Sequence, residues 1–327
     1  MPSMMKSRDH SSPHSDAFVD GKIEAQNLKL LGVTKYVQAI ASGEGLPYWS
    51  DLQEQLDDCA QNPDRRGKTQ DDRFMVFVPV SGGLDSMTAL AMAVDSGHNV
   101  CAVYVNTGAA YSAAEKEAVG VNVGGHMAAI LKDGRQQSLH FETLEMPVIY
   151  KKYEHVDRGR NLIAIVAIAN YAREMERWGE LWFGNVGEYG ESGVIAGDKS
   201  HRFFIEMNVM LREAGFPIEV RSPLVGLNKT DLVRWWLAHY DDADKWLGRQ
   251  WSCHSQEPEH CGQCSGCWSR WVAFKELGMA AIPPMPVTDF SSKVALAKER
   301  WDNHTTTSLA HSRVRLIRYL KAMDIPL

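Results

Sequence analysis

The sequence lacks several features that would assign it to common classes of protein. No apolar run approaches the roughly 18 residues that a membrane span needs, and residues 1–20 are polar, without the apolar segment of a secretory signal. Basic residues are not in excess, because 35 lysines and arginines face 41 acidic residues, for a net charge of −6. These absences argue against nucleic-acid binding through bulk positive charge. They favour a cytoplasmic protein with no membrane partner.

A Walker phosphate loop is also absent, because no Gly-x-x-x-x-Gly-Lys-Ser/Thr run occurs. A different glycine turn is present instead. The β-branched and aromatic run Phe74–Val80 indicates a buried parallel strand. It is followed directly by Ser81-Gly82-Gly83-Leu84-Asp85-Ser86 and then by an apolar-periodic helix.

A glycine turn between a strand and a helix N-terminus presents backbone amides and the positive end of the helix dipole to an anion. Gly82 and Gly83 let a phosphate approach the main chain, and the hydroxyls of Ser81 and Ser86 can donate to it. Asp85 would repel a phosphate unless a cation lay between them. Its presence therefore indicates Mg²⁺.

Strand-like and helix-like segments alternate along the rest of the core. The expected strands after the first are Val100–Val105, Ser138–Glu142, Leu181–Gly184 and Ile218–Arg221; the expected helices are Ser86–Ser96, Glu115–Ile130, Leu162 to about Trp178, Phe203–Glu213 and one opened by Asn228 that runs to about Tyr240. This alternation predicts a doubly wound, Rossmann-like α/β fold with a parallel sheet. Arg160, at the entrance of one helix, can place positive charge over a phosphate. The alternative for Arg160 is an ordinary solvated helix start.

Four of the six cysteines fall within a short stretch near the end of the predicted core. Cys253, Cys261, Cys264 and Cys267 have the spacing Cys-x7-Cys-x2-Cys-x2-Cys, which indicates a metal site rather than a disulfide framework. Four thiolates favour a closed, tetrahedral, structural Zn²⁺ site. An iron–sulfur cluster is the main alternative.

We expect five parts along the chain. They are a disordered tail (1–20), an N-terminal helical extension with a linker (21–72), an α/β domain that carries the glycine turn (73–250), a zinc-binding region (251–278) and a C-terminal helical extension (279–327).

The loop Ser81–Ser86 resembles the pyrophosphate loop of the N-type ATP pyrophosphatases, of the adenine nucleotide alpha hydrolase type. With the cysteines, the chain resembles the QueC family over about residues 74–278. The matching positions are Cys261, Cys264, Cys267, Arg270, Ala273, Phe274 and Gly278, together with Arg160-Asn161, Pro223-Leu224, Lys229 and Ser252-Cys253. Two segments depart from the family pattern, Asn106–Ala109 after the second strand and Asp198–Ser200.

The resemblance implies an ATP-dependent, AMP-forming synthase in queuosine biosynthesis. ATP would adenylate 7-carboxy-7-deazaguanine, ammonia would displace AMP to give an amide, and a second ATP would activate the amide to give the nitrile, 7-cyano-7-deazaguanine. Ser81, Gly82, Gly83, Leu84 and Ser86 would then bind the pyrophosphate and Asp85 the Mg²⁺. Arg160 and Lys229 would be cations for phosphate or acyl-adenylate, and the zinc would hold the C-terminal lobe.

Two alternatives remain open from the sequence. The adenylated carboxylate could be passed to an amine on a protein acceptor or another molecule, as in QueC-like antiphage systems. A zinc-ribbon protein that binds nucleic acid or modifies tRNA is less favoured, because the chain is acidic and no catalytic cysteine pair stands near the loop. A homodimer is compatible with the sequence.

Overall fold

A computed structural model describes residues 73–109, 111–146, 159–186, 201–224, 227–255, 259–262 and 264–282. All of these lie in the unit that runs from Glu54 to Leu327. The predicted tail and N-terminal extension, nearly all of the C-terminal extension, and Asp198–Ser200 lie outside the described residues. None of the helices within these ranges is long and apolar enough to cross a membrane.

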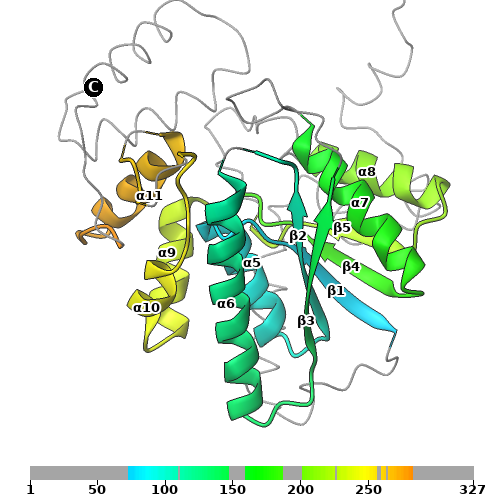
Figure 1. The fold of residues 1–327 in the computed structure, drawn as a ribbon, viewed down its shortest axis with the longest axis horizontal. Coiled ribbons are helices and arrows are strands. Elements are labelled where there is room, and N and C mark those ends of the chain that lie inside the picture. Colours follow the sequence, from blue (N-terminus) through cyan, green and yellow to red (C-terminus); the bar gives the residue numbers. More distant parts are fainter. Residues whose placement is uncertain are drawn as a thin grey trace, which may run out of the picture. The chain divides into compact units, whose positions relative to one another are not determined.

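Five strands form one parallel sheet, whose order is β3-β2-β1-β4-β5 (Figure 1). The strands are β1 (Phe74–Pro79), β2 (Val100–Asn106), β3 (Leu139–Glu145), β4 (Trp178–Trp182) and β5 (Ile218–Arg221). The chain moves outward from β1 to β3 and then crosses to β4 on the other side of β1. The strand order therefore reverses between β1 and β4, and ligands of such sheets bind at the carboxyl ends of the strands at this point.

Helices cover both faces of the sheet, which confirms the predicted doubly wound fold. On one face, α7 (Arg160–Glu174) and α8 (His201–Glu213) pack on alternate side chains of the central strands, among them Phe77 and Val103. The intervening side chains, such as Val76 and Ala102, are fully buried. Because strand side chains alternate between faces, these point toward the layer that contains α5 (Leu84–Asp95) and α6 (Ser112–Lys132).

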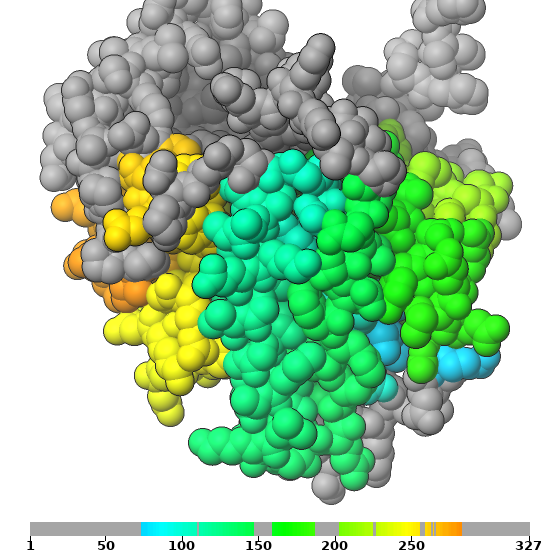
Figure 2. Space-filling model, in the orientation of Figure 1, coloured from blue at the N-terminus to red at the C-terminus, as the bar shows by residue number. Residues whose placement is uncertain are grey.

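Three further helices extend this second layer. They are α9 (Lys229–His239), which packs against α5, α10 (Ala243–Gly248) and α11 (Ser265–Lys275), which packs against α9. In the space-filling view, α6 occupies the middle of one face, with α9–α11 on one side and α7 and α8 on the other (Figure 2). The predicted C-terminal helical region with its cysteines is thus present, whereas α10 was not predicted from the sequence.

The predicted boundary between α7 and β4 is wrong, and the strand expected at Leu181–Gly184 is Trp178–Trp182. The helix expected to run to Trp178 ends at Glu174, and Trp178 is already the first residue of β4. Glu176 has a positive φ of 52°, which reverses the chain, and the amide of Arg177 donates to the carbonyl of Ala172 at 2.9 Å. Pairing of Trp178 with Phe74 of β1 extends the strand backward, a tertiary effect that helical periodicity does not reveal.

The start of α9 is determined by a capping box. The Asn228 side chain accepts from the amides of Thr230 (2.8 Å) and Asp231 (3.1 Å), and the Asp231 carboxylate accepts from the amide of Asn228 (3.0 Å). These bonds satisfy amides that have no partner within the helix. They also place Lys229 at the first position of α9, at the carboxyl edge of the sheet.

Replacing Asn228 by alanine is expected to lower the free energy of unfolding by about 1 kcal/mol, because the first amides of α9 lose their acceptor. Urea unfolding followed by circular dichroism measures this difference. The Asn228→Ser variant retains a capping oxygen and should unfold close to the wild type. An alanine variant as stable as the serine variant would contradict the role of the cap.

Candidate functional site

The glycine turn after β1 is stabilised by its own serines. The amide of Ser81 donates to Ser86 Oγ at 3.1 Å, the two hydroxyls are 3.2 Å apart, and Ser86 Oγ donates to the carbonyl of Gly83 at 3.2 Å. Gly83 is the N-cap of α5 and has no side chain that could accept from the first amides of the helix. These amides, with the helix dipole, can therefore bind an anion.

Two other segments of the chain pack closely against this turn. A Cβ on Gly82, whose φ is 73°, would lie 2.8 Å from Ala118 Cβ and 3.1 Å from the carbonyl oxygen of Glu115, both on α6. A Cβ on Gly184, just after β4, would lie 2.6 Å from Ser86 Cα. Glycine is therefore required at both positions, and the loop lies in the crevice where the strand order reverses.

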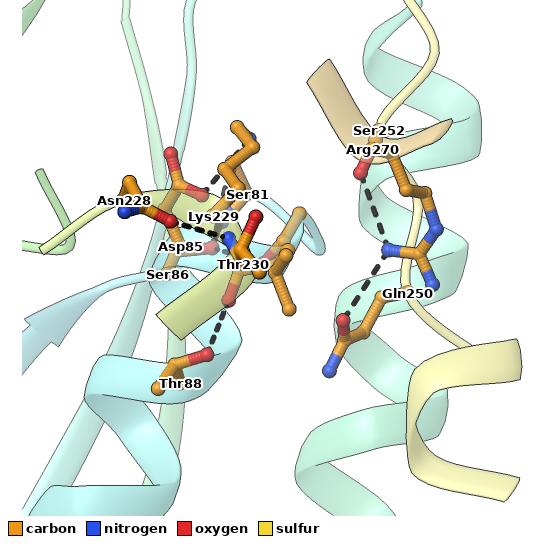
Figure 3. A network of polar contacts seen from close by, with 12 residues as sticks. Ser81, Asp85, Ser86, Thr88, Asn228, Lys229, Thr230, Gln250, Ser252 and Arg270 are labelled. Carbon is orange, nitrogen blue, oxygen red and sulfur yellow. Dashed lines mark hydrogen bonds and ion pairs between the residues drawn. The ribbon is translucent and has the colours of Figure 1, made fainter. Parts of the chain in front are cut away.

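Asp85 and Lys229, which are far apart in the sequence, meet at this turn (Figure 3). Lys229 Nζ lies 2.9 Å from Asp85 Oδ1, and both side chains are about one fifth exposed, 18% and 21% respectively. The ion pair places a fixed cation and a carboxylate beside the N-terminus of α5. The structure thus brings these two predicted site residues together with Ser81 and Ser86.

Arg160 lies at the start of α7, directly after Gly159, whose φ is 89°. Its Nη1 donates to Tyr111 Oη at 3.0 Å. The Tyr111 ring is in turn 5.4 Å from the imidazole ring of His254, which precedes the closely spaced cysteines. The pKa of His254 is lowered mainly by burial and further by the positive charges of Arg160 and Lys229. His254 therefore lies within the electrostatic field of both predicted cations.

The sequence analysis did not single out Glu115, which lies in the first turn of α6. Burial raises its pKa to about 7, against the opposing effects of Arg160 and a hydrogen bond with Tyr104. Glu115 and Tyr111 follow the carboxyl end of the second strand, where ligands of such sheets bind. That position is the signal in the sequence that could have identified them.

The four clustered cysteines converge, and their Sγ atoms all lie within 4.8 Å of one another. Cys253 Sγ and Cys264 Sγ are 4.0 Å apart. Backbone amides of Ser255 and Cys261 donate to Cys253 Sγ, and those of His254 and Cys267 donate to Cys264 Sγ, at 3.3–3.4 Å. The pKa of the Cys264 thiol is lowered, and the largest cause is its hydrogen bond with the Cys253 side chain. Four sulfurs around one point, with amides supporting their negative charge, fit a tetrahedral metal site.

The cysteine region is joined to the glycine turn by main-chain contacts. The amide of Trp251 donates to the carbonyl of Gly82 at 2.7 Å. A Cβ on Gly266, between two of the cysteines, would collide with the carbonyl oxygen of Ser252. Only glycine therefore fits where α11 begins.

A fully buried arginine, Arg270 of α11, completes this connection. Its guanidinium donates to the carbonyls of Leu247 and Ile282 and lies 3.4 Å and 3.5 Å from the side-chain oxygens of Gln250 and Ser252 (Figure 3). Burial lowers its pKa to about 10, so it remains a cation at neutral pH. It holds the segment before the cysteines against α11.

The family model for the queuosine biosynthesis protein QueC matches residues 75–278. The relatives include proteins named 7-cyano-7-deazaguanine synthase. The protein from Alteromonas mediterranea is 25% identical over 222 residues, which cover 62% of this chain and 94% of the relative. That from Methanoculleus marisnigri is 28% identical over 221 residues, which cover 61% and 93%.

A further relative of the same name, from Thermosynechococcus vestitus, is 42% identical, but over 72 residues that cover 22% of this chain and 28% of the relative. The family match includes the glycine turn, the Asp85–Lys229 pair and all four clustered cysteines, and it extends over more than half of the sequence. The chain therefore belongs to the QueC family.

Proposed function

We propose that this protein is an ATP-dependent, AMP-forming synthase that converts 7-carboxy-7-deazaguanine to 7-cyano-7-deazaguanine. One observation carries the proposal. The glycine turn, whose backbone amides can bind an anion, lies where the strand order reverses, and the Asp85–Lys229 pair lies beside it. The relatives' name, 7-cyano-7-deazaguanine synthase, supplies the product. Ammonia supplies the nitrogen.

In this proposal, the substrate carboxylate attacks the α-phosphorus of ATP, and pyrophosphate leaves. The amides of Gly83, Leu84 and the following residues at the start of α5 would hold the pyrophosphate, with the Ser81 and Ser86 hydroxyls and the backbone of Gly82. Lys229 and Arg160 would stabilise the negative charge that develops on the transferred phosphoryl group and the acyl-adenylate. The turn and the start of α5 are already formed without a bound nucleotide.

Magnesium fits this site through Asp85. One carboxylate oxygen faces Lys229, and the other can take a hard cation that prefers oxygen ligands. When bound, Mg²⁺ would neutralise the negative charge of the phosphates beside this carboxylate. The lysine would then shift from screening Asp85 to contacting the nucleotide.

Zinc fits the sulfur cluster, because Cys253, Cys261, Cys264 and Cys267 fill a tetrahedral shell. A closed shell leaves no position for a reacting water. The ion would serve to hold the start of α11 against the 251–255 segment, and thereby Trp251 against Gly82. Its role is structural.

The Asp85→Asn variant is expected to lose AMP release by about 100-fold or more, because the neutral amide cannot retain Mg²⁺ near the phosphates. The assay incubates purified protein with ATP, Mg²⁺, 7-carboxy-7-deazaguanine and ammonium, and follows AMP and the base by mass spectrometry. Asp133→Asn, at the far end of α6, is the matched control and should leave the rate unchanged.

Two outcomes would contradict this assignment. Unchanged AMP release in Asp85→Asn would exclude the magnesium role of that residue. A wild-type protein that releases no AMP with the base present would exclude the proposed reaction. Thermal unfolding of both variants shows whether any loss reflects misfolding.

Metal analysis is expected to find about one zinc ion per chain. The Cys264→Ser variant should lose that metal and unfold at a lower temperature, because metal binding contributes directly to folding. Cys101→Ala, on β2 and away from the cluster, should keep the metal. Iron with inorganic sulfide in place of zinc would overturn the structural zinc assignment.

A further inference from the structure

A predicted cation of the site, Arg160, has one hydrogen-bond partner among the described residues. This partner is the phenol oxygen of Tyr111, which accepts from Nη1 of the guanidinium at 3.0 Å. Arg221, by contrast, is paired with the carboxylates of Glu180 at 3.0 Å and Glu219 at 3.3 Å. Because a guanidinium carries several N–H donors in one plane, Arg160 can bind an anion while it keeps its bond to Tyr111.

The backbone of Tyr111 is fixed at the start of α6. Tyr111 is the N-cap residue of this helix, and its carbonyl accepts from the amide of Glu115 at 3.1 Å. The carbonyl of the next residue, Ser112, accepts from the Tyr104 hydroxyl of β2 at 3.0 Å. One turn further along α6, the backbone packs against Gly82 of the glycine turn. Short stretches of main chain therefore connect Tyr111 both to the sheet and to the glycine turn.

The side chain of Tyr111 is buried, and an aromatic neighbour contacts its ring. The imidazole ring of His254 lies 5.4 Å away, tilted by 32°. The backbone amide of His254 donates to Cys264 Sγ at 3.4 Å, which holds this segment at the cysteine cluster. The phenol oxygen that accepts from Arg160 thus belongs to a ring whose position is set by packing on one side and by the start of α6 on the other.

The bond between Arg160 and Tyr111 joins the two helix layers of the fold. Arg160 begins α7 on one face of the sheet, and Tyr111 precedes α6 on the other face. Both helices start at the carboxyl edge, where ligands of such sheets bind. An arginine side chain has many rotamers, and a donor stabilises developing charge best when it is oriented before the reaction begins. A fixed acceptor on the opposite layer provides that orientation.

We propose that Tyr111 is a positioning residue that orients the Arg160 guanidinium for the adenylation step. This inference rests on the proposed function, because it gives Tyr111 a part in that same reaction. Tyr111 is not among the positions that match the family pattern, and it closely follows Asn106–Ala109, where the chain departs from that pattern. The resemblance to the family therefore does not predict this contact.

The Tyr111→Phe variant removes the accepting oxygen and keeps the ring beside His254. Exchange of labelled pyrophosphate into ATP, dependent on 7-carboxy-7-deazaguanine, reports adenylation alone. We expect the kcat of exchange to fall by about 10-fold, the scale of one hydrogen bond to a charged group. The KM for ATP should change by about two-fold at most, because Arg160 acts mainly on charge that develops in the transition state.

Tyr171→Phe is the matched control. It removes the same group from α7, where the Tyr171 hydroxyl lies 3.4 Å from Glu142 Oε2. This variant should exchange at the wild-type rate. Thermal unfolding of both phenylalanine variants measures any difference in stability.

A double-variant cycle tests whether Tyr111 acts through Arg160. Arg160→Ala should lower the kcat of exchange by about 100-fold, because a cation at the developing charge is lost. Adding Tyr111→Phe to Arg160→Ala should cause no further loss, since the group that the phenol orients is already gone. A role of the phenol in general packing would instead lower the rate by the same factor in both backgrounds.

The outcomes separate this inference from the proposed function. Equal losses from Tyr111→Phe in the two backgrounds would overturn the positioning role, and so would a wild-type kcat in the single variant. Wild-type exchange in Arg160→Ala would overturn it too, while the proposed reaction would stand. Absence of exchange in the folded wild-type protein would overturn the proposed function and this inference with it.

Discussion

Close backbone packing around the glycine turn is the constraint on which the rest of the site depends. Gly82 lies against the backbone of α6 and against Trp251, and Gly184 brings the end of β4 against Ser86. Three segments that are remote in the sequence therefore converge on one short loop. Side chains larger than hydrogen do not fit at Gly82 or Gly184, so these segments meet at backbone distance.

This packing connects the cysteine cluster, which is far from the loop in sequence, to the loop in space. The cysteines hold the start of α11, Arg270 ties α11 to the segment 247–252, and Trp251 of that segment hydrogen-bonds to Gly82. A buried guanidinium that donates to neutral oxygens is costly unless those oxygens are fixed. The arginine therefore favours one arrangement of this segment, and that arrangement places His254 near both Arg160 and Lys229.

Local features made much of this structure predictable. The turn after β1, the alternation of strands and helices, the cap at Asn228 and the cysteine spacing are encoded by neighbouring residues. The end of α7 is not encoded by neighbouring residues, because Trp178 belongs to β4 only through pairing with Phe74. The Asp85–Lys229 contact was anticipated as two separate roles, but its 2.9 Å geometry depends on how α9 packs against α5.

The environment of Glu115 was beyond sequence reasoning for a related reason. A glutamate in the first turn of a helix ordinarily interacts favourably with the helix dipole and remains exposed. Here burial raises the pKa of Glu115 more than Arg160 of α7 and Tyr104 of β2 lower it. The departure from the family pattern at Asn106–Ala109 directly precedes this helix. The glycine turn, by contrast, keeps the pattern on which the family resemblance is based.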